Sequence, residues 1–365
     1  MSGPAILYVH DLRGSGVVVN AMALARKLGA ERETILCAGY AKGLYRDADV
    51  SPARLVTLAG ETEPRLPRWR AAMRLRALIR ETGAGLAMSM GNFGHVTVFA
   101  ATRGMPVKAV YRISNEIGRP TRGTRNLRRR SWQRLLLATA DRLILVGRAL
   151  AEQPLFADAL ASGKAAYIPN GVDVDSARVK GQAPVPHPWL SDGGPAVVLT
   201  IGRIHPQKNL PTLIDAFAIA AKVRPLRLIV VGTGEAELTA RLKEQAREAG
   251  LTDSVLFAGE TDNVFAWLAR SDLFALVSKW EGSSTALLEA LAVGTPILAS
   301  RQAGDAAHVL ADGRYGVLVD AGDASEIAAG ILRQLSPERV LPSDRVDEFR
   351  LERTHALYLE QLRSL

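Results

Sequence analysis

The chain alternates short apolar runs with helical stretches along its whole length, and this alternation restricts the fold more than any other feature. Apolar runs of about four to eight residues are typical of buried strands, and the longer segments between them predict crossover helices. This repeat predicts an α/β fold with doubly wound parallel sheets. In the first half, the predicted strands are residues 5–10, 34–38, 55–59, 85–90, 107–113, 142–146 and 165–168.

Length and a proline-rich segment suggest how the chain divides. A chain of 365 residues is long enough for two domains, each with its own core. Residues 172–194 lack periodicity and contain three prolines after position 183, which is typical of a linker. We therefore expect a first domain over residues 1–175, a linker over 176–194 and a second doubly wound domain over 195–340. The tail, residues 341–365, ends with helical spacing of its apolar residues.

The sequence KWEGSSTALLE, which begins at Lys279, follows a predicted buried strand at residues 272–278. Its second part has the Ala and Leu content of a helix, and Ser283 or Ser284 is placed to cap that helix. Glu281 is therefore expected in a loop at the carboxyl end of a strand and beside a helix amino terminus. Open α/β sheets bind ligands at such loops, and free backbone N–H groups there attract phosphate.

A second acid, Glu289, follows Glu281 by eight residues. Along a helix that rises about 1.5 Å per residue, this spacing corresponds to roughly 12 Å. The paired carboxylates of glycosidases lie only about 5–9.5 Å apart. The spacing therefore disfavours a hydrolase pair and suits one elongated ligand that is held at both ends with its phosphates between.

Another predicted strand-to-helix turn, GRIHPQK, begins at Gly202 and carries two cations, Arg203 and Lys208. The preceding apolar run, residues 196–202, predicts a strand, and residues 209–223 predict an amphipathic helix. A guanidinium fork and an ammonium point charge near the start of a helix suit a diphosphate.

The first predicted strand ends at His10 and is followed by a loop that contains Gly14 and Gly16. Glycines let backbone approach a ligand, and N–H groups before a helix can contact an anion. The dinucleotide fingerprint is absent because Val19 stands where its third glycine belongs. A structural turn and a ligand loop both remain open, and a packed or an acceptor-side role remains open for His10 and for His95.

Positive charge is concentrated in the first half. Residues 1–180 hold 28 Lys and Arg against 14 Asp and Glu, a net of +14, and the remainder holds 18 against 23, a net of −5. One basic segment begins at Arg65, ends at Arg80 and carries Trp69. A basic helix with a tryptophan is typical of helices that lie in an anionic membrane interface. The alternative is a solvated arginine-rich face.

The motifs of the second half, in this order, resemble the carboxyl-terminal half of the retaining GT-B glycosyltransferases of family 4. The resemblance covers about residues 160–335 and rests on Gly202-Arg203 with Lys208, VGTG from Val231, FAG from Phe257 to Gly259, the Glu281-x7-Glu289 pair and GTP from Gly294. It implies a GT-B fold of two Rossmann-like domains that face a cleft, with the chain's tail crossing back to the first domain.

The resemblance also implies an activity. It implies transfer of a hexose or N-acetylhexosamine from a nucleotide diphosphate sugar to a glycan or lipid-linked acceptor, with retention of the anomeric configuration. Glu281 is then expected to hold the donor sugar and Glu289 the ribose, while Arg203 and Lys208 neutralise the leaving diphosphate. The other expected donor-binding residues are Gly14, Gly16, Gly202, Gly259, Gly282, Ser283, Ser284 and Thr285. The family is metal-independent, and no metal-ligand spacing occurs here, so no cofactor or metal is expected.

Two positions depart from the family pattern. Many members carry a histidine at the end of the strand that corresponds to residues 107–113, and this chain has Arg112 and Asn115 there instead. An acceptor-side histidine cannot be transferred to this position, so Arg112 and Asn115 become acceptor-side candidates. Asp305 stands where the family often has a glycine, and either a sugar contact or a helix cap would explain it.

Two other function classes fit parts of the sequence. A sugar-nucleotide epimerase shares the GT-B fold, but the additional acids and histidines that its base chemistry needs are missing. A nucleic-acid-binding protein would explain the basic half, but aromatic residues make up only 5% and no recognition motif occurs. We therefore expect no nucleic-acid partner.

The sequence also indicates a location. Its one cysteine fits a reducing compartment, and it contains neither a signal peptide nor an apolar stretch of the roughly 18 residues that a membrane-spanning helix needs. We expect a cytoplasmic protein, either free or peripheral on the inner face of the plasma membrane. The expected process is synthesis of a bacterial envelope polysaccharide or lipopolysaccharide.

Overall fold

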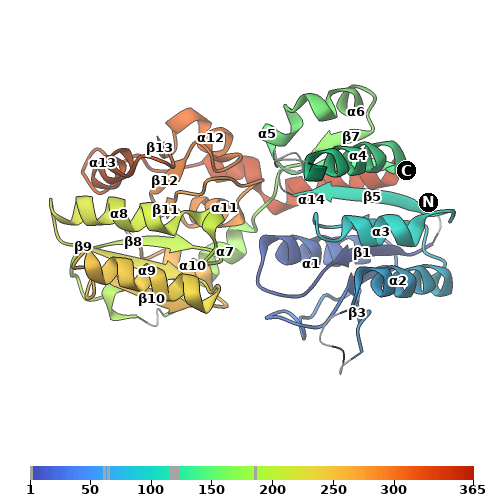
Figure 1. Ribbon diagram of the computed structural model, residues 1–365, viewed down its shortest axis with the longest axis horizontal. Coiled ribbons are helices and arrows are strands. Elements are labelled where there is room, and N and C mark those ends of the chain that lie inside the picture. The colour runs from blue at the N-terminus through green and yellow to red at the C-terminus, as the bar shows by residue number, and fades with distance from the viewer. Residues whose placement is uncertain (1–2, 61–62, 64–65, 115–123, 185–186) are drawn as a thin grey trace. The chain divides into compact units, whose positions relative to one another are not determined.

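The computed structural model describes residues 3–60, 63, 66–114, 124–184 and 187–365 and divides the chain into two compact units (Figure 1). Unit 1 consists of Met1–Asn170 and Thr354–Leu365, and unit 2 consists of Gly171–Arg353. Each unit contains one parallel sheet with helices on both faces, as the alternation of apolar runs and helical stretches predicts.

The sheet of unit 1 has seven strands in the order β3-β2-β1-β4-β5-β6-β7, and all pairs are parallel. The seven strands predicted in the first half are all present. Their bounds are β1 Ala5–Val9, β2 Thr34–Ala38, β3 Arg54–Thr57, β4 Leu86–Ser89, β5 Lys108–Ile113, β6 Arg142–Leu145 and β7 Ala165–Tyr167. The central strands are buried along their whole length, which explains why they read as continuous apolar runs.

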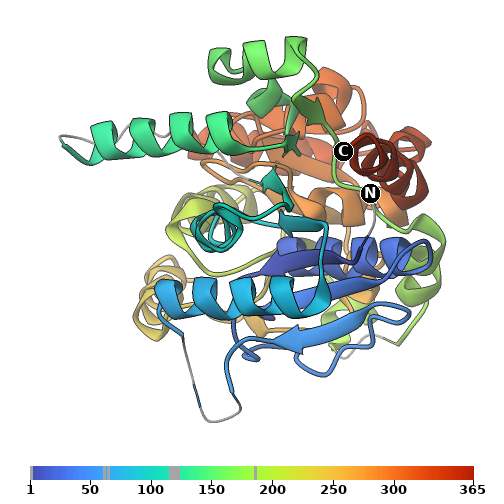
Figure 2. The same ribbon diagram turned by 90° about the vertical axis from the view of Figure 1, so that its right-hand side faces the viewer.

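Helices cover the two faces of this sheet (Figure 2). One face packs against α1 (Gly16–Gly29) and α14 (Leu351–Arg363), and the other against α2 (Arg68–Thr82), α3 (His95–Thr102) and α4 (Thr124–Thr139). The shorter α5 (Arg148–Ala151) and α6 (Ala157–Ala161) lie between β6 and β7 in the chain. The end of α14 is tied down by Arg142, whose guanidinium donates to Gln361 Oε1 and Ser364 Oγ, both at 2.9 Å.

The sheet of unit 2 has six parallel strands in the order β10-β9-β8-β11-β12-β13. Their bounds are β8 Ala196–Ile201, β9 Leu226–Val231, β10 Val255–Gly259, β11 Leu273–Leu276, β12 Ile297–Ser300 and β13 Val317–Val319. On one face lie α8 (Leu210–Ala221), α9 (Ala236–Glu248) and α13 (Ala324–Gln334); on the other lie α7 (Val174–Gly181), α10 (Val264–Leu268), α11 (Thr285–Val293) and α12 (Ala306–Val309).

In each sheet, successive strands are added first toward one edge and then, after one crossover, toward the opposite edge. The reversal lies between β1 and β4 in unit 1 and between β8 and β11 in unit 2. At such a point the loops after the two neighbouring strands leave in opposite directions, and the space at their carboxyl ends is where open α/β sheets bind ligands. In unit 2, this rule selects the loops that follow Ile201 and Leu276.

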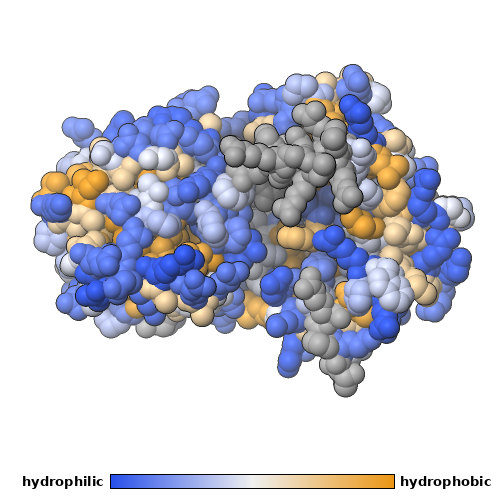
Figure 3. Space-filling model, viewed as in Figure 1, coloured by the Kyte–Doolittle hydropathy of each residue, from blue (hydrophilic) through white to orange (hydrophobic). Residues whose placement is uncertain are grey.

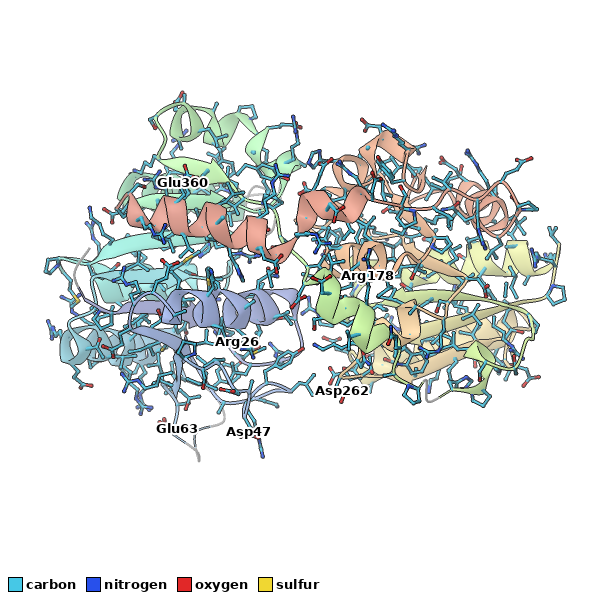
Figure 4. All side chains as sticks on the ribbon, turned by 180° about the vertical axis from the view of Figure 1, so that it is seen from behind. Arg26, Asp47, Glu63, Arg178, Asp262 and Glu360 are labelled. Carbon is cyan, nitrogen blue, oxygen red and sulfur yellow. The ribbon has the colours of Figure 1, made fainter. Side chains whose placement is uncertain are left out.

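The linker expected over residues 176–194 is wrong in its first part, because helix α7 lies there and belongs to unit 2. The Asp173 carboxylate caps this helix by accepting from the Ser176 N–H at 2.9 Å, and Ala177 is fully buried. Arg178, labelled on α7 in Figure 4, points its Nε at the Ala292 carbonyl at 3.4 Å. A helix of eight residues is too short to produce a clear apolar period, so the sequence pattern could not reveal it.

Candidate active site

Two loops meet at the carboxyl ends of β8 and β11. The first contains the short 3₁₀ turn Pro206–Lys208, and the second contains Glu281. Lys208 Nζ donates to Glu281 Oε1 at 2.7 Å, and both side chains are mostly buried, with 18% and 11% of their surface exposed. An ion pair with so little exposure is screened less by water and salt than a surface pair.

Local backbone geometry fixes the position of Lys208. The His205 imidazole Nδ1 accepts from the Gln207 N–H at 3.2 Å, and the Lys208 N–H donates to the His205 carbonyl at 2.9 Å. Gly202 has a φ of +145°, and a Cβ there would lie 2.7 Å from Lys208 Cε. A glycine is therefore required, because it permits this backbone conformation and leaves the lysine stem room to lie against it.

Glu281 is held by three donors. Besides Lys208, Ser278 Oγ donates to Oε1 at 2.8 Å, and Gln207 Nε2 donates to Oε2 at 3.0 Å. Gln207 Nε2 also donates to the Trp280 carbonyl at 2.8 Å, so one amide joins the two loops. Three hydrogen bonds fix the orientation of the carboxylate.

Glu289 is the fifth residue of helix α11, in its second turn. Its side chain keeps some exposed surface, yet no described residue donates a hydrogen bond to its carboxyl group. Removal of water by the surrounding protein raises the pKa of Glu289 to about 7, against the opposing charges of Lys208 and Lys180. This acid is therefore poised between its neutral and ionised forms near neutral pH.

Further cations stand near these acids. Arg203 is exposed and forms no ion pair or hydrogen bond with residues that the structure describes. Lys180, on α7, acts electrostatically on Glu289 and lies 5.9 Å from the centre of the Phe265 ring. Burial, and secondarily the charge of Arg203, lowers the pKa of His205. The site therefore combines a fixed ion pair with an unpaired guanidinium.

Close backbone contacts join the loops that follow β8, β9 and β10. The Gly202 N–H donates to the Val231 carbonyl at 2.9 Å, and the Gly232 N–H donates to the Gly259 carbonyl at 2.7 Å. A Cβ at Gly232 would lie only 2.1 Å from the Gly202 carbonyl oxygen. The predicted donor residues Gly202 and Gly259 thus have a structural role in this contact, and Gly259 has open space where a side chain would stand.

The segment between Glu281 and α11 contains the other predicted donor residues, Gly282, Ser283, Ser284 and Thr285. Gly282 is buried. A Cβ at Gly304 would lie 2.4 Å from the Gly282 carbonyl oxygen, so the loop that contains Gly304 packs closely against this segment. Ser284 is the N-cap residue of α11, but its side chain makes no capping hydrogen bond. Of the two capping residues that the sequence suggests, Ser284 occupies the N-cap position without supplying the side-chain hydrogen bond.

The predicted glycine loop of unit 1 lies at the end of β1. Gly16 is the first residue of α1, and the Ser15 side chain caps the helix by accepting from the Val18 N–H at 3.4 Å. Gly14 is exposed, and the nearest atom to a Cβ there would be Leu44 Cδ2 at 3.9 Å. These facts fit a structural turn and leave open space beside Gly14.

His10 follows β1 and is partly exposed. Its ring packs between Tyr40, at 5.2 Å between ring centres, and Phe93, at 6.0 Å. With Leu66 and Arg68 it lines a small cavity of about 270 Å³. His10, one of the predicted acceptor-side residues, therefore borders a cavity.

His95 lies in the core and does not suit an acceptor contact. Only 2% of its surface is exposed, and Nδ1 is 2.8 Å from Ser89 Oγ. Burial, with a contribution from the charge of Arg112, lowers the pKa of His95 to about 3, so the ring is neutral at physiological pH. The sequence leaves this position open because a strand-to-helix loop can direct a side chain inward or outward.

Arg112 is buried with 1% of its surface exposed, and the structure assigns it a contact role different from the predicted one. Its Nε donates to the Tyr358 hydroxyl at 2.9 Å, Nη1 to the Met90 carbonyl at 3.0 Å, and Nη2 to Asn170 Oδ1. The guanidinium thus joins the strand β5 to α14 and to the end of unit 1. The other candidate at this position, Asn115, lies outside the described residues.

Asp305 precedes α12, and its side chain makes no capping hydrogen bond to that helix. The residue is buried, with 3% of its surface exposed, and the missing capping bond excludes the helix cap, one of the two explanations that the sequence offers. Within the described part of the chain, no group of three or more His, Cys, Asp or Glu residues is arranged to hold a metal ion. In that same part, no helix is long and apolar enough to cross a membrane.

Three site residues are missed by the sequence patterns: Gln207, Ser278 and Lys180. Gln207 stands inside the cationic turn and Ser278 ends the predicted strand, so their positions were visible but their contacts with Glu281 were not. Lys180 lies in the segment that reads as a linker. Its approach to Glu289 depends on the packing of α7 against α11, for which the sequence carries no local signal.

Comparison with known proteins yields two family models that together span both units. A model described as Glycosyltransferase Family 4 matches residues 14–176, and one described as Glycosyl transferases group 1 matches residues 185–346. The chain is 34% identical over 135 residues to the lipopolysaccharide core biosynthesis glycosyltransferase LpsE of Rhizobium meliloti, covering 37% of this chain and 38% of that protein.

Other relatives and solved structures resemble the same chain. The phosphatidyl-myo-inositol mannosyltransferase of Mycobacterium leprae is 34% identical over 177 residues, covering 47% of this chain and 44% of that protein. The chain thus spans less than half the length of these curated relatives. The crystal structure of Anabaena Alr3699/HepE in complex with UDP and glucose superimposes with a TM-score of 0.78 at 20% identity and covers 100% of both chains. At that identity the likeness establishes the fold alone, which is the two-domain GT-B fold.

Proposed function

The chain belongs to the glycosyltransferases of family 4, and from this premise we propose that it transfers a sugar from a nucleotide diphosphate sugar to an acceptor. The transferred group is a hexose or an N-acetylhexosamine, and its anomeric configuration is retained. One observation carries the proposal. A buried Lys208–Glu281 ion pair stands at the carboxyl ends of β8 and β11, at the topological switch point of unit 2.

The cations of this site suit a leaving diphosphate. Negative charge accumulates on the diphosphate as its bond to the sugar breaks, and preorganised positive groups stabilise that charge. Lys208 is held in place by Glu281 and by the turn around Gly202. Arg203 has no partner among the described residues and is available to a phosphate. Backbone N–H groups at the start of α11 add to the same field.

The two acids are assigned to the two ends of the donor. Glu281, whose orientation three hydrogen bonds fix, accepts from hydroxyls of the transferred sugar. Glu289, to which no described residue donates, accepts from the ribose hydroxyls. A desolvated acid without donors is costly in the free protein, and a ligand hydroxyl removes part of that cost.

The acceptor is a glycan or a lipid-linked glycan, and the process is synthesis of an envelope polysaccharide or lipopolysaccharide. LpsE of Rhizobium meliloti is named for lipopolysaccharide core biosynthesis, and the Mycobacterium leprae relative is named for a phosphatidylinositol acceptor. The protein acts in the cytoplasm or on the inner face of the plasma membrane. The reaction needs neither a cofactor nor a metal ion, because Lys208 and Arg203 supply the positive charge.

The activity is tested by release of nucleoside diphosphate from a panel of UDP-, GDP- and ADP-sugars, with and without glycan acceptors and with a chelator present. Release that depends on one donor and increases with an acceptor is expected, and nuclear magnetic resonance of the product should show the anomeric configuration of the donor. Interconversion of the donor sugar without release of nucleoside diphosphate would instead identify an epimerase. An inverted product would contradict the retaining assignment.

A further inference from the structure

Beyond sugar transfer, we propose that one face of helix α2 docks the protein on a membrane surface of anionic phospholipid. The α2 face consists of Trp69, Arg70, Met73 and Arg80 on one side of the helix and of Arg68 at its amino end, and all five are exposed. Trp69 is 60% exposed and Met73 is 62% exposed. Because these two residues are four positions apart, they lie one above the other on the same side of the helix.

Two other arginines of α2 are already engaged within unit 1 and are not part of this face. Arg74 donates to Glu63 Oε2 at 2.5 Å, and Glu63 is labelled in Figure 4. Arg76 donates to the carbonyls of Ala101 and Arg103 at 3.0 and 2.7 Å. These two arginines hold α2 against its neighbours. Their positive charge therefore has a structural role within unit 1.

The arginines of the α2 face have no such role. Arg68, Arg70 and Arg80 form no ion pair and donate no hydrogen bond to residues that the structure describes. Arg68 and Arg70 lie in the first turn of α2, which contains no acidic residue, and cations there oppose the helix dipole. The helix dipole therefore gains no stabilisation from them, and neither guanidinium is neutralised by an ion pair with a described residue. The Arg70 guanidinium lies 5.1 Å from the centre of the Trp69 ring.

The loop after β4 carries another exposed apolar side chain. Phe93 is 68% exposed, and its ring stacks on His10. His10 and Arg68 line the same small cavity, which places Phe93 beside the amino end of α2. Figure 3 shows strongly hydrophilic residues mixed with paler ones over the surface of α2.

This combination selects a lipid surface among anionic partners. Phospholipid headgroups supply phosphate for the arginines, and the interface beneath them accepts tryptophan, methionine and phenylalanine side chains. A soluble anionic polymer would neutralise the arginines but would leave Trp69 and Met73 in water. We therefore assign the α2 face to a bilayer.

The test is co-sedimentation of the full chain with vesicles of phosphatidylcholine, alone or mixed with phosphatidylglycerol. The wild type should bind only the anionic vesicles, and binding should fall steeply between low and high salt. Replacing Arg68, Arg70 and Arg80 together by Gln should weaken the partition about 100-fold, because each arginine near an anionic surface contributes roughly 5-fold. The variant W69S/M73S should weaken binding and leave the salt dependence in place.

Two control variants remove the same number of cations or of apolar side chains from the surface of unit 2. K222Q/R333Q/R353Q removes three exposed cations without described partners, and V223S/L341S removes two exposed apolar side chains. Both should bind as the wild type does. The proposal is overturned if the wild type fails to bind anionic vesicles, if the triple variant on α2 binds as well as K222Q/R333Q/R353Q, or if W69S/M73S binds as well as V223S/L341S. Donor turnover with a soluble acceptor is measured on every variant, so failure to dock is distinguished from failure of sugar transfer.

Discussion

Glu281 and Lys208 form the centre of the proposed site, and neither acts independently of its surroundings. The carboxylate is oriented by Ser278 and Gln207 as well as by the lysine, and Gly202 leaves space for the lysine stem. Because the pair is mostly buried, removal of one partner leaves the other as a charge with poor access to water. Each substitution therefore reports on the whole network and not on one contact.

The first prediction concerns the cations. Lys208→Ala and Arg203→Ala should each lower turnover about 100-fold or more at saturating donor, the size of effect seen when a transition-state donor is removed. The measurement is the steady-state rate of nucleoside diphosphate release. Lys222→Ala, which removes an exposed cation elsewhere in unit 2, should keep the wild-type rate. Near-normal turnover in both site variants would remove these residues from the site.

The second prediction concerns the pKa of Glu289, which burial raises from 4.5 to about 7. Because the folded state binds this proton more tightly than the unfolded state, ionisation of Glu289 costs stability as the pH rises through this window. Glu289→Gln should therefore match the wild type near pH 4 and be more stable above about pH 8, by about 1–3 kcal/mol. Denaturant unfolding at both pH values measures the difference.

A control for this measurement is Glu338→Gln, which changes an exposed acid of the same unit. It should shift stability by similar small amounts at both pH values. If Glu289→Gln also behaved in that way, the environment that we describe for Glu289 would be wrong.

At the scale of residues, the sequence shows which side chains can carry the chemistry better than it shows which side chains are buried. Arg203, Lys208 and Glu281 follow strands that are adjacent in the sheet, so their positions in the chain already place them at one edge. His95 and Arg112 also follow or end strands, but the structure buries both. The direction of a side chain at the end of a strand depends on one residue of register, which apolar patterning alone does not determine.

At the scale of elements, the strands were the most predictable feature. Strands of a parallel sheet are covered on both faces, so each reads as a continuous apolar run of distinctive length. Helix α7 is the counterexample, since its eight residues bury only one narrow side and its capping residue, Asp173, lies in a stretch that otherwise resembles a linker. Because this segment was expected to be a linker, the electrostatic effect of Lys180 on Glu289 was not predicted.

The third prediction concerns Arg112, which connects β5 with α14 and with Asn170. Replacing it by Met should destabilise the protein by about 3 kcal/mol or more, because it removes three buried hydrogen bonds from a charged donor, and each contributes about 1.5–3 kcal/mol. Tyr358→Phe removes only one of these hydrogen bonds and should cost less. Urea unfolding measures both, and an unchanged midpoint for Arg112→Met would show that the guanidinium does not join these elements.

At the scale of the whole molecule, the two units differ in charge and in proposed task. The first 180 residues carry a net charge of +14, and the remainder carries −5. The donor site is assigned to unit 2, and the α2 face belongs to unit 1. The fold class could be predicted because alternation of strands and helices determines it, whereas the donor base, the donor sugar and the acceptor depend on loop contacts that no pattern in the sequence specifies.

The central claim is that unit 2 holds a nucleotide diphosphate sugar with Glu289 at the ribose and Glu281 at the transferred sugar. Calorimetric titration of UDP, GDP and ADP into the wild type, Glu281→Gln and Glu289→Gln tests it most directly. We expect one of these products to bind the wild type, to bind Glu281→Gln nearly as well, and to bind Glu289→Gln about 10- to 100-fold more weakly, since a charge-assisted hydrogen bond contributes about 1.5–3 kcal/mol. Failure of all three products to bind, or the reverse order of the two variants, would contradict the account.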